Sequence, residues 1–174
     1  MEKHYGGISH KLVTGLLAII LVQGFFDWIG VSNTVQYVLF IFTYVLIVAY
    51  WVRHKHSVKR FPPKNGLGVL IDIIAMFVLF LIMKAASLQI GFYFAALAVL
   101  RAVDALGISR MLSEYVLKRA EAHRFNTLRK IYFLEAIIYV LFESLSFNYG
   151  LPNVLGITAL MLVWLFGRIS EHEL

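Results

Sequence analysis

The 174-residue chain contains no cysteine, only three prolines and only ten acidic residues. The lack of cysteine excludes disulfide bonds, thiolate metal ligands and a cysteine nucleophile. Polar sequence is also scarce, because 60% of the residues are hydrophobic, more than a soluble domain of this length can bury. We therefore expect an integral membrane protein with no room for a second folded domain.

Six apolar segments fill most of the chain. A helical bilayer crossing needs about 20 apolar residues. The predicted crossings are Lys11–Gly30, Thr34–Val52, Gly66–Ala85, Phe92–Ser109, Ile131–Phe147 and Leu151–Arg168. The fold class predicted from this pattern is all-α, a polytopic membrane protein with six transmembrane helices. Few positive charges precede the first segment and Asp27-Trp28 follows it, so we expect a retained helix, not a cleaved signal.

Basic residues alternate between the connections that join these segments. They occur at both termini and in the second and fourth connections, whereas the first and fifth connections have none and the third has only Lys84. Basic connections stay on the cytoplasmic side during insertion. Both termini are therefore predicted to be cytoplasmic, in the inner (plasma) membrane of a bacterium or archaeon.

Residues 109–125, between the fourth and fifth crossings, have a different pattern. Apolar residues such as Met111, Tyr115 and Phe125 alternate there with charged residues. This pattern predicts an amphipathic linker helix that partly continues the fourth helix and then lies along the membrane surface. The linker is either a simple connection or a mechanical lever between two bundles.

Two basic clusters lie on the predicted cytoplasmic side, and the net charge of the chain is +6. Their members are Arg53, Lys55, Lys59 and Arg60 in the second connection, and Lys118, Arg119 and Arg124 in the fourth. Such clusters bind anionic lipid headgroups, which makes membrane lipids one expected partner. A nucleotide or single-stranded nucleic acid on the cytoplasmic face is the other reading.

No enzyme motif, metal site or cofactor site is expected. The chain has no Gly-x-Ser-x-Gly, His-Glu-x-x-His or glycine-rich phosphate loop. Its six histidines all fall in predicted cytoplasmic segments, and the pair His54 and His56 has no acidic residue nearby. We expect a protein that is not an enzyme.

Five ionisable residues matter within the predicted crossings: Asp72, Arg101, Asp104, Glu135 and Glu143. Ionisable side chains are costly in lipid and usually face the bundle interior. Asp72 and Arg101 lie at similar depths in antiparallel helices, since each residue adds about 1.5 Å, and are predicted to pair. Arg101 and Asp104 can also pair along one helix face. This cluster either fixes helix packing or carries a moving charge.

The third and fourth crossings each carry a short motif. The run Ile71-Asp72-Ile73-Ile74-Ala75 lies in the third, and positions 101, 104, 107 and 110 keep an every-third spacing in the fourth. These motifs resemble the third helix and the charged fourth helix of the voltage-gated cation channel superfamily. The resemblance implies a four-helix voltage-sensor-like module with its linker in residues 1–125 and a two-helix pore module in residues 126–174.

The chain departs from that superfamily in two respects. Asp104 and Gly107 replace arginine in the fourth helix, and one charge crossing the field is worth about 2.3 kcal/mol per 100 mV, so little voltage sensitivity is expected. The connection at residues 148–152 is too short for a selectivity-filter loop. Gating by a cytosolic anionic ligand is therefore expected instead of gating by voltage.

Glu135 and Glu143 in the fifth crossing are the predicted pore residues. One glutamate per subunit forms an acidic ring in a homo-oligomer, with a tetramer favoured, and such rings attract cations. Local pairing is the alternative, of Glu135 with Arg129 or Lys130 and of Glu143 with water or Lys84.

The function predicted from the sequence is an oligomeric ion channel gated by a cytosolic anionic ligand. By analogy of architecture, such a pore suits a bacterial antiviral defence effector. The alternatives are a small-molecule carrier or substrate-binding membrane subunit, and a structural membrane partner.

Overall fold

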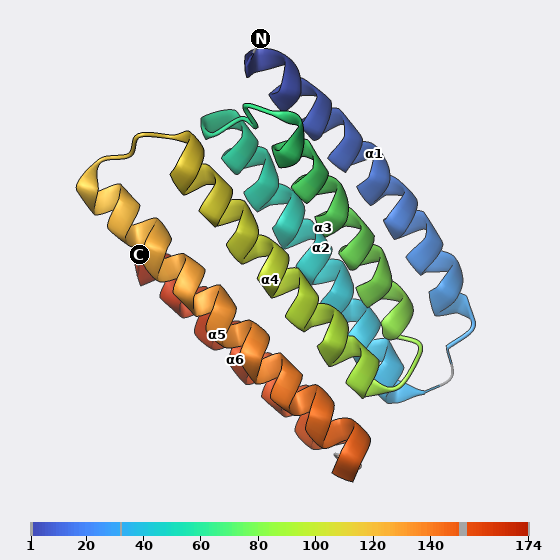
Figure 1. Cartoon of the computed structure of the whole chain (residues 1–174). Coiled ribbons are helices and arrows are strands. Elements are labelled where there is room, and N and C mark those ends of the chain that lie inside the picture. Colours follow the sequence, from blue (N-terminus) through green and yellow to red (C-terminus); the bar gives the residue numbers. More distant parts are fainter. Residues whose placement is uncertain (1, 32, 150–152, 174) are drawn as a thin grey trace. The chain divides into compact units, whose positions relative to one another are not determined.

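The computed structural model describes residues 2–31, 33–149 and 153–173, and within these ranges it is all-α (Figure 1). The six helices are α1 (Glu2–Ile29), α2 (Thr34–Arg60), α3 (Gly66–Ala85), α4 (Ile90–Glu114), α5 (Arg119–Tyr149) and α6 (Asn153–Glu173). The prediction of an all-α chain is confirmed.

Five of these helices, α1 to α5, are long and apolar enough to cross a membrane. Among the described residues of α6, the apolar stretch is Leu155–Leu165. Large apolar side chains such as Ile19, Phe26, Ile137 and Leu162 are exposed along the helices, as lipid contact requires. The chain is a polytopic membrane protein, and its sixth crossing stays a prediction.

The linker helix predicted for residues 109–125 continues the fourth helix over residues 109–114, as expected, but no helix of its own lies between α4 and α5. Residues 109–114 complete α4, residues 115–118 are not helical, and α5 begins at Arg119. At Tyr115 the backbone is extended, with φ −122° and ψ 135°, and its N–H donates to the carbonyl oxygen of Met111. From Arg119 to Tyr149 the sequence has no glycine or proline, so the charged turns continue into the apolar turns as one helix.

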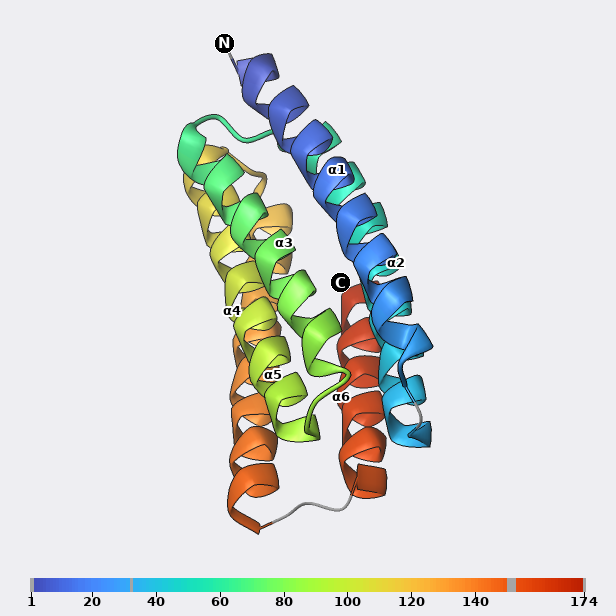
Figure 2. The ribbon, with the colours of Figure 1, turned by 90° about the vertical axis from the view of Figure 1, so that its right-hand side faces the viewer.

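The contacts divide the chain into two compact units, which we call unit 1 (residues 1–87) and unit 2 (residues 88–174). In unit 1, α1 packs against both α2 and α3. In unit 2, α4 and α5 form an antiparallel pair and α6 packs against α5 (Figure 2). The functional division predicted at residue 125 stays a prediction.

Local sequence signals end and begin the helices of unit 1. The side chain of Asn33 accepts a hydrogen bond from the Val35 N–H at 2.9 Å, and the side chain of Asn65 accepts one from the Gly68 N–H at 3.1 Å. These caps satisfy backbone donors at the starts of α2 and α3. The helix α2 ends at Arg60, before Pro62-Pro63, as the lack of proline N–H groups predicts.

Close approach in unit 1 depends on Gly24. A Cβ atom at this position of α1 would lie 2.6 Å from the Sδ atom of Met83 on α3. A larger residue here would therefore require the end of the Met83 side chain to move. The contact aligns the carboxyl-terminal halves of α1 and α3, where their polar residues meet.

Aromatic rings set the register of α4 against α5 in unit 2. The ring of Phe94 packs against Tyr139 and Phe142, with centroids 6.2 Å and 5.4 Å apart. The ring of Phe147 packs edge-on against Phe92 at 5.0 Å and covers the α4 backbone at Gly91. This register brings the charged residues in the middle of the two helices together.

Candidate functional site

A buried guanidinium group lies at the centre of unit 2. The Nε atom of Arg101 is 2.5 Å from Oε2 of Glu135, and its Nη1 atom is 3.1 Å from Oδ2 of Asp104. The Arg101 Cζ atom also lies 5.2 Å from the centroid of the Tyr132 ring. The whole residues Arg101 and Glu135 are only 5% and 2% exposed. We call Arg101, Asp104, Glu135 and Tyr132 the arginine cluster.

The helical repeat places these four side chains together. Arg101 and Asp104 are three residues apart on α4, and Tyr132 and Glu135 are three residues apart on α5, so each pair shares one helix face. The sequence analysis anticipated the contact between Arg101 and Asp104. It did not identify Arg101 as a partner of Glu135, because the register of α4 against α5 depends on ring packing that no local pattern encodes.

Helix α6 packs over the Glu135 side chain of the arginine cluster. A Cβ atom built on Gly167 would overlap Oε1 of Glu135. The buried Gly167 therefore lets the α6 backbone pass directly over the carboxylate. This contact could not be predicted from the sequence, since a lone glycine near a helix end gives no signal of a long-range neighbour.

A second polar centre in unit 1 surrounds Asp72. The Ser9 hydroxyl on α1 donates a hydrogen bond to Asp72 Oδ2 at 2.5 Å, and His54 Nδ1 on α2 lies 3.8 Å from Oδ1. Ser9 is fully buried and His54 is 7% exposed. The imidazole stacks on the ring of Tyr50 at a centroid distance of 6.1 Å. We call Ser9, His54 and Asp72 the aspartate centre.

The order of these groups decides what the aspartate centre can do. In a nucleophilic triad the imidazole stands between hydroxyl and carboxylate, whereas here the carboxylate receives the hydroxyl directly. The arrangement ties α1, α2 and α3 together instead of activating Ser9. His54 was predicted to lie in a connection, and neither it nor Ser9 was predicted as a neighbour of Asp72. The predicted pair of Asp72 with Arg101 would join the two units and stays a prediction.

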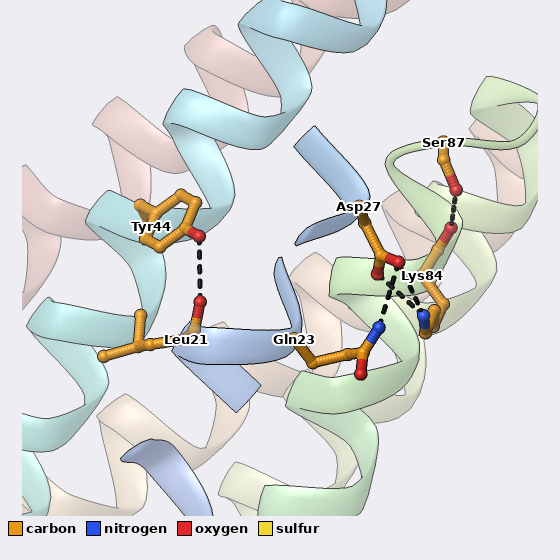
Figure 3. Close-up of polar contacts among 6 residues, drawn as sticks. All are labelled: Leu21, Gln23, Asp27, Tyr44, Lys84 and Ser87. Atoms are coloured by element: carbon orange, nitrogen blue, oxygen red, sulfur yellow. Dashed lines mark hydrogen bonds and ion pairs between the residues drawn. The ribbon is translucent and has the colours of Figure 1, made fainter. Parts of the chain in front are cut away.

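An ion pair at the other end of unit 1 joins α1 to α3 (Figure 3). The Lys84 ammonium donates to both carboxylate oxygens of Asp27, at 2.9 Å and 2.7 Å, and Gln23 donates to the same carboxylate at 3.1 Å. In the same region Tyr44 on α2 donates to the carbonyl oxygen of Leu21 at 3.0 Å. The sequence analysis considered Lys84 for Glu143 and did not identify Asp27 as its partner.

The predicted basic residues lie in two different settings. On the last turns of α2, Arg53 lies over Tyr50, Lys55 over Trp51 and Arg60 over Phe61, with distances to the ring centroids of 5.3 Å, 5.5 Å and 5.2 Å. In contrast, Lys118 lies in the connection from α4 to α5, and Arg119 and Arg124 lie on the first turns of α5; all three are exposed.

The remaining predicted site residue, Glu143, is half-buried on α5, two turns beyond Glu135. Among the described residues, no group of three or more histidine, aspartate or glutamate side chains could hold a metal ion.

The fold and its buried charges define a polytopic helical membrane protein with ionisable side chains inside its apolar helices. No protein-family model, curated protein or solved structure matches the chain.

Proposed function

We propose that the protein moves ions across the membrane as a homo-oligomeric channel, with a tetramer favoured. The observation that carries this proposal is the arginine cluster, in which charged side chains are buried within two apolar helices. Ionisable residues in the membrane interior are costly and mark ion pathways in many membrane proteins.

Within this proposal the two glutamates of α5 have different roles. Glu135 is 2% exposed and held by Arg101, so it positions α5 against α4. Glu143 is half-buried, and the exposed Val140 and Phe147, three residues before it and four after it, share its side of α5. Another copy of α5 that covers this apolar face would bring the Glu143 carboxylates into a ring. Such a ring concentrates cations at the pore.

The same cluster supports gating by a ligand instead of by voltage. The charge of Arg101 is accompanied on α4 by that of Asp104, so a displacement of α4 would move little net charge through the field. The exposed Lys118 and Arg119 lie at the end of the connection from α4 and at the start of α5. A nucleotide or single-stranded oligonucleotide bound there would act directly on the helix pair that carries the cluster. A pore of this kind would depolarise a bacterial cell as an antiviral defence effector.

A carrier for a small molecule is the second candidate. It is favoured by the enclosure of the arginine cluster, since Gly167 of α6 packs over Glu135 and leaves both charged residues almost inaccessible. Buried polar groups between helices are typical of substrate sites in such carriers. A monomer with substrate uptake but no current would favour this function.

The channel proposal is tested by currents from the purified protein in planar bilayers. We expect cation-selective currents that Glu143→Gln reduces, most strongly at low salt where screening is weakest. Glu143→Lys should shift the preference toward anions. The control is Glu121→Gln, which removes the same charge from α5 near its first turn. Unchanged selectivity in both Glu143 variants removes this residue from the pathway, and a protein that never conducts favours the carrier.

A further inference from the structure

The last two turns of α2 extend beyond the hydrocarbon core of a bilayer. The helix has 27 residues and is therefore about 40 Å long at 1.5 Å per residue. The hydrocarbon core is only about 30 Å thick, and the headgroup layers bring the bilayer to about 40–45 Å. The apolar sequence begins at Thr34, so the excess length falls at Arg53–Arg60, at the level of the lipid headgroups.

One exposed face of α2 carries apolar side chains first and cations after them. Ile41, Val45, Val48 and Val52 are 54%, 48%, 53% and 43% exposed, and Lys55 and Lys59 follow them, also exposed. Steps of three and four residues join these six positions, so they form one stripe along the helix. The apolar part of the stripe, from Ile41 to Val52, is about 17 Å long, and positive charge follows at its end. The stripe therefore matches a phospholipid, which has an apolar acyl chain and a charged headgroup.

The charge around this stripe is of one sign. No acidic residue occurs between Asp27 and Asp72, whereas five basic residues occur there. The other basic region differs, since Arg110 and Glu114 at the end of α4 form an ion pair with a distance of 3.6 Å. The end of α2 therefore produces a positive potential at headgroup level, which attracts anionic lipids.

We propose that this stripe binds one anionic phospholipid, with its acyl chain along Ile41 to Val52 and its phosphate at Lys55 and Lys59. The Nζ atom of Lys55 lies 5.5 Å from the centroid of the ring of Trp51, which is one turn earlier on the same face of α2. An aromatic ring below the cation marks the interface between hydrocarbon and headgroups.

The geometry favours a lipid over a nucleic acid at this site. Proteins that bind single strands offer open aromatic faces on which bases stack. Here Tyr50 is 8% exposed, with His54 stacked on its ring and Arg53 over it, and Lys55 covers Trp51. The cations are thus presented to phosphate groups, and the aromatic faces next to them are already occupied.

The fluorescence of Trp51 can report on lipid binding at this site. The chain has three tryptophans, so Trp28→Phe and Trp164→Phe leave Trp51 as the sole source of tryptophan emission. This variant is reconstituted in phosphatidylcholine vesicles with a small fraction of acyl-brominated phosphatidylglycerol, or the same fraction of acyl-brominated phosphatidylcholine. We expect stronger quenching by the brominated phosphatidylglycerol, because the anionic lipid is enriched beside Trp51.

The ratio of the two quenching efficiencies gives the lipid preference in each variant. Lys55→Gln with Lys59→Gln should lower this preference at least about fivefold, given the contribution of each basic residue near anionic headgroups. The matched control, Lys118→Gln with Arg119→Gln, removes two charges from the other exposed basic segment and should leave the preference unchanged.

Equal quenching by the two lipids in the parent variant overturns the proposal. So does an equal loss of preference in both double variants, because the effect would then reflect net charge alone. A single-stranded oligonucleotide that binds the detergent-solubilised protein only when Lys55 and Lys59 are present, without a lipid preference, would assign this end of α2 to nucleic acid. None of these measurements depends on ion conduction, so the lipid site and the channel proposal can fail separately.

Discussion

The Nε atom of Arg101 lies 2.5 Å from Oε2 of Glu135, and this contact joins α4 to α5 inside two apolar helices. The two side chains are 6% and 2% exposed. A charge in such a place is strongly destabilising when its partner is removed, because the remaining ion stays in a medium of low dielectric constant. The pair therefore decides how firmly the two helices are held together.

Removal of either partner should destabilise the protein. Arg101→Gln leaves the buried carboxylates of Glu135 and Asp104 without their cation and should lower the free energy of unfolding by about 3–5 kcal/mol. Glu135→Gln leaves Arg101 paired with Asp104 and should cost less. The double variant should recover part of the Arg101→Gln loss, since only the Asp104 carboxylate then remains. Thermal unfolding in detergent, followed by circular dichroism, measures the three variants, and strictly additive losses would contradict direct coupling.

A second double-mutant cycle tests the pair of Asp72 and Arg101 that was predicted from the sequence. Asp72→Asn should destabilise unit 1, because Asp72 receives the Ser9 hydroxyl and faces His54. If Asp72 and Arg101 also interact, the double variant Asp72→Asn with Arg101→Gln should lose less than the sum of the single changes. Additivity would show that the two residues act separately.

Gly167→Ala should loosen the packing of α6 on α5. The added methyl group would overlap the Glu135 carboxylate, and a contact of this kind costs about 1–3 kcal/mol. Gly15→Ala is the matched control, because a Cβ atom there has no neighbour within 4 Å and alanine favours the helix. Proteolysis of α6 in detergent should accelerate in Gly167→Ala alone, and equal rates in both variants would exclude the close contact.

Loss of the Asp27–Lys84 ion pair should have a much smaller effect. The Lys84 side chain is 37% exposed and that of Asp27 is 19% exposed, so water can replace part of the interaction. We expect Lys84→Gln to reduce stability by less than about 1 kcal/mol. The reduction should shrink further at high salt, which screens exposed pairs. A loss as large as that for Arg101→Gln would show that the pair is inaccessible to water in the membrane.

The predicted membrane topology can be tested by cysteine labelling, because the chain has no cysteine of its own. Single cysteines are placed at Thr34, Lys59, Gln89, Ala120 and Asn148, all of which are exposed. An impermeant maleimide added outside intact cells should label the first, third and fifth positions and spare Lys59 and Ala120. One reversed position would contradict the six-crossing topology.

Contacts within one helix followed from the sequence, whereas contacts between helices did not. Arg101 and Asp104 are three residues apart, and a helix brings such positions to the same face whatever surrounds it. The partner of Arg101 on α5 depends on how α4 and α5 are aligned, which the rings of Phe94 and Phe147 determine. Lys84 and Asp27 are 57 residues apart, and they meet because α1 and α3 are likewise aligned by their packing.

The hydropathy of the chain by itself determined that this is an all-α membrane protein, because lipid forces every backbone polar group into helices. It also placed Asp72, Arg101, Asp104, Glu135 and Glu143 on those helices. Only the tertiary structure decided that Glu135 meets Arg101 under Gly167, that Asp72 receives Ser9, and that α4 passes into α5 without a linker helix. Helix formation depends on neighbours in sequence, but these contacts depend on the close packing of side chains far apart in it.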